Sequence, residues 1–283
     1  MRIIYIDIDT LRADHLGCGG YHRNTSPNID NVASEGINFR NVYASDVPCL
    51  PSRTALITGM FGIRNGVINH GGRAADLQPE GKDRGFFGRF SMRSWASVFY
   101  LAGWHTASIS SFPFRHGASW WNSGFMESMN LMRGFGGERA DQVIPGALDW
   151  LERRGKADDW FLHVHLWDPH TPYRTPEDYG NPFESDPVPS WHTEDVRLAN
   201  WDLSGPHSAQ EPWGFRPDEW GEPPPRQPWN ASSMDAVKQI FDGYDVGIRY
   251  ADDAVGVLLN KLADLNVLED TAVLISSDHG EAF

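Results

Sequence analysis

The sequence predicts an α/β fold with a mostly parallel central sheet and helices on both of its faces. Near-continuous apolar runs lead into carboxylates at both ends of the chain, at 2–9 and 271–278, and such runs are typical of parallel strands covered on both sides. Strand-like and helix-like segments alternate between them, as in sheets whose strands are joined by helices. A chain of 283 residues is long enough for one large unit of this kind or two small domains.

The individual elements follow from local signals along the chain. Ser26 followed by Pro27 opens a helix, and Pro51 suits the first turn of another, where its missing N–H is not needed. Gly59 ends this second helix. We expect strands or extended segments at 2–8, 37–44, 104–110, 160–167 and 271–276, and helices at 26–34, 51–57, 92–102, 141–154 and 234–265.

A long segment at about 175–229 lacks sustained helical or strand periodicity and is rich in proline, tryptophan and acidic residues. An irregular segment of this length in a compact domain is typical of an insertion. Its five tryptophans argue against wholesale disorder, because disordered segments are poor in aromatic residues. We therefore expect one domain over residues 1–283, interrupted by this insertion.

Composition and charge exclude several classes of protein. The chain has 38 acidic and 24 basic residues, giving a net charge of −14, which argues against a nucleic-acid-binding protein. No apolar run approaches the roughly 20 residues that span a bilayer, so no membrane segment is expected. No leader precedes the first strand, so the chain as given is expected in the cytoplasm, whereas a removed leader would make it periplasmic or secreted. Its two cysteines, Cys18 and Cys49, imply no disulfide framework.

The pentapeptide Cys49-Leu50-Pro51-Ser52-Arg53 points to an enzyme. Cys49 stands at the positive end of the predicted helix, with Arg53 one turn further on. Helix-end N–H groups and a guanidinium together form a site for a tetrahedral anion, and they are expected to lower the pKa of the thiol. The alternative is a cysteine that serves as a small buried hydrophobic residue.

The two acidic strand ends predict a metal site. Asp9 ends the first strand, and Asp278 and His279 follow the last. Ligands of open α/β sheets collect beyond the carboxyl ends of the strands, and carboxylates that meet there require a cation. Oxygen ligands favour calcium or magnesium, and the histidine leaves manganese open. Asp7 points to the same side of the strand as Asp9, and its role stays open.

These segments resemble those of a known family. Cys49-Leu50-Pro51-Ser52-Arg53 is similar to the C-x-P-S-R signature of type I sulfatases, in which the cysteine is oxidised to formylglycine. Asp9-Thr10-Leu11-Arg12 and Ser277-Asp278-His279-Gly280-Glu281 resemble the two metal-binding segments of the sulfatase and alkaline phosphatase superfamily. The resemblance implies an alkaline-phosphatase-like fold and a formylglycine-generating enzyme as maturation partner. It also implies a divalent metal, calcium first, held by Asp9, Asp278, His279 and the modified Cys49. Thr10 stands where many sulfatases carry a second aspartate.

A histidine beyond the fourth predicted strand is a further catalytic candidate. The segment 161–173 ends in His170-Thr171-Pro172, and sulfatases carry a histidine in an H-x-P setting at this place. An imidazole there is suited to protonating a leaving alkoxide or to binding sulfate. His163 and His165 alternate within the strand and are expected to be structural.

The expected sulfate-binding segment departs from the family pattern. Many sulfatases have a K-W-H-x-G segment after the strand at 104–110, and this chain has no lysine there. Arg115 and His116 are the candidates that would supply the positive charge. Asn69 and His70, in an earlier glycine-rich turn, are candidates for substrate contact, with a plain surface loop as the alternative.

The resemblance predicts hydrolysis of a small-molecule or saccharide sulfate ester. Sulfatases continue past this D-H-G segment into a smaller domain, so the chain is expected to be an N-terminal catalytic domain whose C-terminal subdomain is missing. Phosphonate monoester and phosphodiester hydrolases of the same superfamily share the nucleophile and are the nearest alternative. A non-catalytic module that binds glycans through its tryptophans is the alternative from a different class.

Overall fold

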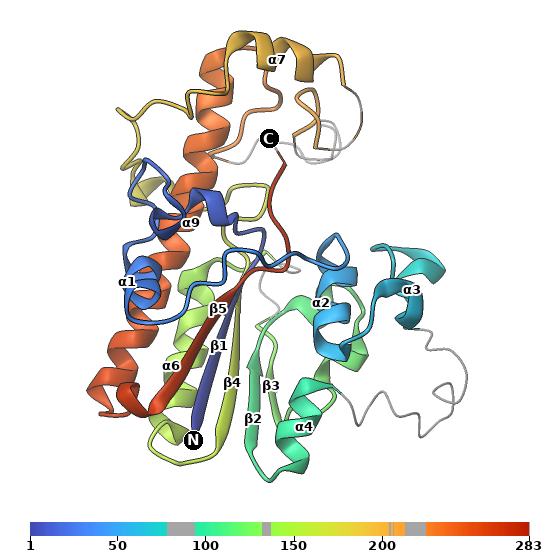
Figure 1. Cartoon of the computed structure of the whole chain (residues 1–283), viewed down its shortest axis with the longest axis vertical. Coiled ribbons are helices and arrows are strands. Elements are labelled where there is room, and N and C mark those ends of the chain that lie inside the picture. Colours follow the sequence, from blue (N-terminus) through green and yellow to red (C-terminus); the bar gives the residue numbers. More distant parts are fainter. Residues whose placement is uncertain (78–93, 132–136, 204, 206, 213–224, 283) are drawn as a thin grey trace. The chain divides into compact units, whose positions relative to one another are not determined.

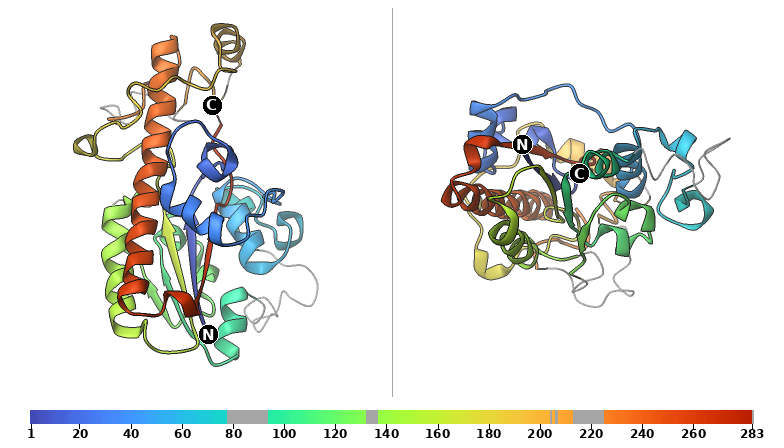
Figure 2. Two further views of the ribbon diagram at one scale, coloured as in Figure 1. Left: turned by 60° about the vertical axis from the view of Figure 1, so that its left-hand side comes forward. Right: turned by 90° about the horizontal axis from the view of Figure 1, so that it is seen from below.

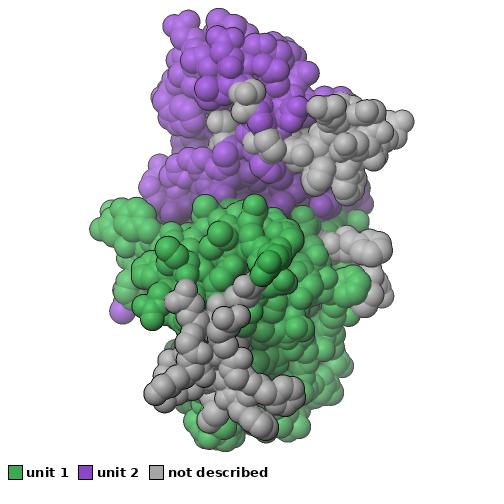
Figure 3. Space-filling model, turned by 90° about the vertical axis from the view of Figure 1, so that its right-hand side faces the viewer, with its two compact units in different colours: residues 1–9, 38–167, 254–279 green, residues 10–37, 168–253, 280–283 purple. Residues whose placement is uncertain are grey.

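The computed structural model describes residues 1–77, 94–131, 137–203, 205, 207–212 and 225–282. The chain divides into two compact units (Figure 3). Unit 1 comprises residues 1–9, 38–167 and 254–279, and unit 2 comprises residues 10–37, 168–253 and 280–283. Each unit is therefore assembled from stretches that are far apart in the sequence.

Unit 1 is built on a five-stranded parallel sheet with the order β3-β2-β4-β1-β5 (Figure 1). Its strands are β1 (Arg2–Ile8), β2 (His105–Ile109), β3 (Glu127–Met129), β4 (Trp160–Leu166) and β5 (Thr271–Ser276). The predicted parallel sheet is confirmed. β3 was not predicted, because three residues are too short to show a period.

The extended segment predicted at 37–44 is not a strand. The structure has no regular element there, and the side chains of Phe39, Val42 and Tyr43 are all more than 70% exposed, at 74%, 74% and 83%. An apolar, β-branched run becomes a strand only when a neighbouring strand pairs with it, and local sequence carries no information on that partner.

The helices agree with the sequence where they are long. In unit 1 they are α2 (Cys49–Thr58), α3 (Gly62–Asn65), α4 (Trp95–Leu101), α5 (Phe112–Arg115) and α6 (Ala140–Arg154), in unit 2 α1 (Pro27–Glu35) and α7 (Glu194–Trp201), and α9 (Met234–Asp264) contributes to both. Single 3-10 turns lie at Ala13–His15, Gly17–Gly19, Gly72–Ala75, Ser119–Asn122, Glu177–Tyr179 and Leu268–Asp270. No helix in the described part of the chain is both long and apolar enough to cross a membrane.

The predicted insertion contains a helix that its sequence pattern did not reveal. In α7 the hydroxyl of Thr193 accepts from the backbone N–H of Val196, and Glu194 and Asp195 occupy the first turn. This capping pattern is the local signal that was missed. Two of the tryptophans of the insertion, Trp213 and Trp220, lie outside the described residues, as do positions 92 and 93 of the helix predicted at 92–102.

The two faces of the sheet differ in polarity although both are buried. On one face α6 places Trp150 against Trp160 of β4, with ring centroids 5.5 Å apart. On the other face α4 places Trp95 near Tyr5 of β1 and His163 of β4, at 5.9 Å and 6.0 Å. Figure 2 shows α6 and α2 on opposite sides of the strands. The polar side chains of the strands therefore lie on the face of the sheet that α2 and α4 cover, which is the face of the site.

Asp252 of α9 caps the N-terminus of α1 within unit 2. Its carboxylate accepts from the backbone N–H of Ile29 at 2.8 Å and from both the backbone N–H and the side-chain amide of Asn28, at 3.0 Å and 2.8 Å. The first N–H groups of a helix have no partner within it, and a buried carboxylate satisfies them with charge-assisted bonds. The sequence did not predict this helix cap, because residues 28 and 252 are far apart in the chain and come together only in the folded protein.

Replacing Asp252 by Ala is expected to lower the free energy of unfolding by about 1–3 kcal/mol, because buried N–H groups lose their acceptors. Chemical denaturation followed by circular dichroism measures the change. Asp253→Ala is the matched control, since Asp253 is the next residue of the same helix and its side chain is 45% exposed. Equal losses in the two variants would contradict the capping role.

Candidate active site

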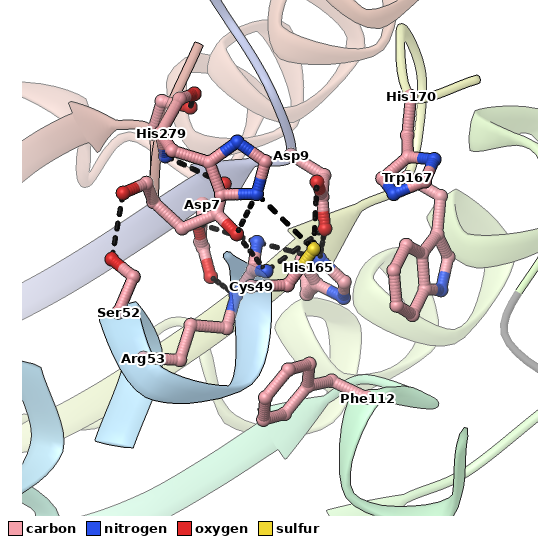
Figure 4. A network of polar contacts seen from close by, with 12 residues as sticks. Asp7, Asp9, Cys49, Ser52, Arg53, Phe112, His165, Trp167, His170 and His279 are labelled. Atoms are coloured by element: carbon pink, nitrogen blue, oxygen red, sulfur yellow. Dashed lines mark hydrogen bonds and ion pairs between the residues drawn. The ribbon is translucent and has the colours of Figure 1, made fainter. Parts of the chain in front are cut away.

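The candidate site lies in unit 1 at the carboxyl ends of β1 and β5 (Figure 4). Asp9 follows β1, and its backbone N–H donates to the carbonyl of Leu166 at 2.9 Å, which continues the strand pairing to the edge of the sheet. Asp278 and His279 follow β5, and Cys49 is the first residue of α2. Parallel strands end at one edge, so residues separated by more than 200 positions meet there.

The four predicted metal ligands come together. One donor atom from each of Asp9, Cys49, Asp278 and His279 lies within 4.8 Å of the others. The sulfur of Cys49 is 3.2 Å from Nε2 of His279 and 3.8 Å from Oδ1 of Asp9. Nε2 of His279 is 3.4 Å from Oδ2 of Asp278. The structure supplies their proximity, and their role as ligands stays a prediction.

Arg53 lies at the centre of the network and is fully buried. Its Nε donates to Oδ2 of Asp7 at 2.7 Å, and its Nη2 lies 3.1 Å from Oδ1 of the same carboxylate. Its Nη1 donates to Oδ2 of Asp9 at 2.8 Å and also to Asp278. Its Nη2 is 2.9 Å from Nε2 of His165. The guanidinium therefore donates to the protein's own groups, and direct contact with a substrate stays a prediction.

The charges of the cluster favour a bound cation. Asp7, Asp9 and Asp278 bring three buried carboxylates to one guanidinium, that of Arg53. Burial raises the pKa of Asp278, and Asp9 adds to the rise although Arg53 opposes it. A second positive charge would relieve this excess, and carboxylate oxygens with one imidazole suit a divalent ion. The residues present therefore fit the metal that the family pattern implies.

The thiol of Cys49 does not have the lowered pKa that the sequence predicted. Burial raises the pKa of Cys49, and the carboxylates of Asp9 and Asp278 raise it further, against the opposing charge of Arg53. The prediction considered the helix end and Arg53 but not the two acidic strand ends that surround the sulfur. It is wrong for the unmodified cysteine.

The N–H groups expected to receive an anion at the start of α2 are already occupied. The N–H of Leu50 donates to Nε2 of His70 at 3.2 Å, and that of Ser52 donates to the carbonyl of Pro48 at 3.0 Å. Pro51 has no N–H. The helix end between residues 50 and 52 therefore offers no free donor, and this part of the predicted anion site is wrong.

Ser52 and His165 belong to the site although the sequence analysis gave them no role in it. The hydroxyl of Ser52 donates to the backbone carbonyl of Asp278 at 2.6 Å and ties α2 to the loop that carries Asp278 and His279. His165 pairs in register with Asp7 across the sheet. Burial, together with Arg53, lowers the pKa of His165 to about 4. The signal in the sequence was that histidines alternate in β4, at His163 and His165, while aspartates alternate at the end of the first strand, at Asp7 and Asp9.

The structure brings together some of the predicted substrate residues. The rings of His70 and His116 lie 4.7 Å apart, and the guanidinium of Arg115 lies over the ring of Trp167 at 4.8 Å. Burial lowers the pKa of His70 to about 4, with Arg115 as the next cause, so this ring is neutral at pH 7. Asn69 is exposed and accepts from the backbone N–H of His70 at 2.8 Å, which engages it within its own loop.

His170 belongs to unit 2, whereas the cluster around Cys49 belongs to unit 1. Within its unit, Nδ1 of His170 contacts the backbone carbonyl of Thr171. The predicted catalytic role of His170 stays a prediction.

Comparisons with known proteins agree with these motifs. A model of the sulfatase family matches residues 2–283. Iduronate 2-sulfatase of Homo sapiens is 26% identical over 326 aligned residues, which cover 100% of this chain and 55% of that protein. An arylsulfatase of Clostridium perfringens is 22% identical, with 99% of this chain and 63% of the relative covered. The chain thus spans a little over half the length of these relatives.

Solved structures share the fold. A protein solved in complex with its substrate D-glucosamine-2-N,6-O-disulfate matches with a TM-score of 0.71 and 20% identity, over 99% of this chain and 65% of that one. The phosphonate monoester hydrolase of Agrobacterium radiobacter matches with a TM-score of 0.72 and 17% identity, over 99% and 62%. The expected fold of the alkaline phosphatase superfamily is confirmed. Since the family model covers almost the entire sequence, the chain belongs to the sulfatase family.

Proposed function

We propose that this protein hydrolyses sulfate esters with a nucleophile derived from Cys49. The observation that carries the proposal is the meeting of Cys49 with Asp9, Asp278 and His279, within 4.8 Å at the edge of the sheet. A nucleophile beside a cation site, above a buried guanidinium, is suited to attack on an anionic ester. Membership of the sulfatase family supports the same reaction.

Two groups added to the chain would complete the chemistry. Formylglycine, made by oxidation of Cys49 by a formylglycine-generating enzyme, would supply a hydrated aldehyde at position 49. One of its hydroxyls would serve as the nucleophile that displaces the alcohol from sulfur, and the other would allow the sulfate to be released afterwards. A divalent metal, calcium first, supplies positive charge beside the attacking oxygen. Asp9, Asp278, His279 and position 49 would hold it.

The remaining residues would bind and protonate the substrate. Arg53 holds Asp9 and Asp278 by charge-assisted hydrogen bonds and keeps these carboxylates facing the nucleophile. Arg115 replaces the missing lysine as the charged group that receives the sulfate. His116 supplies no positive charge, because burial, with His70 and Arg115 as the next causes, holds the pKa of its ring far below neutrality. His170 protonates the leaving alkoxide. Asn69 accepts a hydrogen bond from the backbone of its own loop through Oδ1, and its predicted contact with the substrate through the side-chain amide stays a prediction.

The substrate class that we favour is a sulfated saccharide. A structural neighbour was solved with a disulfated glucosamine as its substrate, and a curated relative is named as an iduronate 2-sulfatase. In this chain Trp167 lies beneath the guanidinium of Arg115 and beside the ring of His116, at 6.4 Å. Trp167 is itself only 2% exposed, so it would hold Arg115 in position for the sulfate group rather than stack on the sugar.

The first test is the mass of the peptide around Cys49, in protein produced with a formylglycine-generating enzyme. We expect a loss of about 18 mass units relative to cysteine, which is the conversion of a thiol to an aldehyde. Turnover of an aryl sulfate by the modified protein completes the test. A glycan-binding module would instead keep its thiol and bind glycans without releasing sulfate.

A phosphonate monoester or phosphodiester hydrolase is the second candidate. The missing lysine and the phosphonate monoester hydrolase among the structural neighbours favour it. The comparison that decides is the ratio of kcat/KM for p-nitrophenyl sulfate and p-nitrophenyl phenylphosphonate on the same modified protein. A ratio above one supports the sulfatase, and a ratio below one supports the alternative.

Replacing Asp278 by Asn is expected to weaken binding of Ca²⁺ by about 100-fold or more, because even an outer partner of a metal site typically contributes about 10- to 100-fold. The substitution removes one negative charge and leaves the shape of the side chain unchanged. Isothermal titration with Ca²⁺ measures the affinity. Asp158→Asn is the control, since this aspartate belongs to the same unit and its side chain is 73% exposed. Unchanged affinity in Asp278→Asn would place the metal elsewhere.

A further inference from the structure

The five N–H donors of Arg53 meet five acceptors in a fully buried site. Four of the acceptors are carboxylate oxygens: both oxygens of Asp7, one of Asp9 and one of Asp278. The fifth is Nε2 of His165, 2.9 Å from Nη2. A guanidinium has five N–H groups and no acceptor, so this set satisfies it completely. His165 supplies the one acceptor that carries no negative charge.

We propose that His165 is a positioning residue, which as the neutral Nδ1–H tautomer locks the guanidinium of Arg53 against the aspartates that face the nucleophile. The proposal rests on the proposed function for its catalytic consequence. Its structural content concerns only residues of unit 1.

The contacts of His165 determine its tautomer. The guanidinium of Arg53 always donates, so Nε2 at 2.9 Å must carry a lone pair and not a proton. Nδ1 therefore carries the proton and donates to the hydroxyl oxygen of Ser110 at 3.3 Å. That oxygen also accepts from the backbone N–H of Phe112 at 3.2 Å, which fixes its position. The opposite tautomer would direct a proton to Asp9 at 3.5 Å and toward the closer N–H of Arg53.

Loss of this acceptor would release the guanidinium. One N–H of Arg53 would then be buried without a partner, and such a group rotates or draws in water to regain a hydrogen bond. Rotation about the guanidinium would move Nη1, which holds both Asp9 and Asp278. These two carboxylates are predicted metal ligands, so their displacement weakens the site although His165 touches neither the metal nor the substrate.

His163 provides a matched control on the same strand. It lies two residues earlier on the same face of β4, is equally buried, and bonds Ser108 as His165 bonds Ser110. The two imidazole rings are parallel within 8° and 6.4 Å apart. Nε2 of His163 is 3.6 Å from Asp7 and makes no hydrogen bond to Arg53 among the described contacts. The two histidines thus differ in the acceptor role that the proposal assigns.

The decisive measurement is ¹⁵N NMR of the histidines in the unmodified full chain at neutral pH, with the His165 resonance assigned by its loss in His165→Gln. We expect a pyrrole-type Nδ1 and a pyridine-type Nε2. The reverse tautomer, or an imidazolium, would overturn the proposal. This result does not depend on sulfatase turnover, so it stands or falls separately from the proposed function.

Three variants test the consequence through Ca²⁺ affinity and kcat. His165→Leu is expected to lose at least about 10-fold in Ca²⁺ affinity, as for other outer partners of metal sites. His165→Gln, whose side-chain oxygen can accept from Arg53, is expected to recover most of it. His163→Leu is expected to stay within about 3-fold of the parent protein, and in the modified enzyme kcat is expected to follow the same order with KM little changed. Equal affinity in all three variants would contradict the positioning role.

Discussion

Replacing Cys49 by Ala is expected to reduce turnover of sulfate esters by about 10⁴-fold or more, because removal of a covalent nucleophile typically costs several orders of magnitude. The side chain is 2% exposed and packs in a small apolar cluster with Leu50, Trp121 and Trp167, so alanine leaves only a small cavity. The fold should remain intact by circular dichroism. Steady-state kinetics with an aryl sulfate measures the loss, and wild-type rates in the purified variant would refute the mechanism.

Two further substitutions test whether the hydrated aldehyde at position 49, and not a thiol in general, is the nucleophile. Cys18→Ala is the control, because Cys18 is partly exposed and lies in unit 2; it should keep full activity. Cys49→Ser offers one hydroxyl instead of the two of the hydrated aldehyde. It is expected to accept sulfate once and then to stop, so that rapid mixing shows at most one equivalent of released alcohol per protein.

Replacing Arg53 by Met is expected to have the largest effect on stability. It leaves Asp7, Asp9 and Asp278 buried without their counter-charge, and removing one partner of a buried ion pair typically costs about 3–5 kcal/mol. Chemical denaturation at pH 7 measures the loss in the free energy of unfolding. Arg153→Met is the control, since the side chain of Arg153 is 45% exposed and its loss should be small.

The effect of Arg53 depends on pH in a direction that follows from Asp7. Burial acts to raise the pKa of Asp7, but the charge and hydrogen bonds of Arg53, together with the nearby ring of His163, overcome it, so this pKa lies below its ordinary value. A lowered pKa in the folded state contributes stability that is present above the unfolded value and lost as the pH falls. The difference between the parent protein and Arg53→Met should therefore be largest near neutral pH and shrink toward acid. A difference that grows toward acid would contradict this account.

The sequence predicted the parts of the site that depend on the pattern of apolar residues along the strands and on the residues at the strand ends. β1 and β5 each show an apolar run that leads to a carboxylate, and parallel strands bring such ends to one edge. That reasoning alone was sufficient to group Asp9, Asp278 and His279. Cys49 joined them through its place at the start of a helix, where Pro51 and Gly59 marked the limits of the element.

The parts that failed depend on partners that are remote in the sequence. The predicted pKa of Cys49 considered the helix end and Arg53, whereas Asp9 and Asp278 dominate the surroundings of the sulfur after burial. The N–H groups at the start of the helix were expected to receive an anion, whereas the N–H of Leu50 donates a hydrogen bond to His70 of a separate loop. The run at 37–44 had the composition of a strand and found no partner. In each case the local signal was present, and the presence or absence of a partner distant in the sequence decided the outcome.

The two dissimilar faces of the sheet determine which positions of the strands tolerate amino-acid substitution. In most sheets a period of two separates the interior from water, and a polar residue marks the tolerant side. Here both sides of β4 are buried, and the polar positions His163 and His165 alternate with Leu162 and Val164. On the apolar face, exchange of one aliphatic side chain for another costs little stability, whereas the polar face tolerates few substitutions. The usual expectation is thereby inverted: the hydrophilic positions of these strands are the constrained ones.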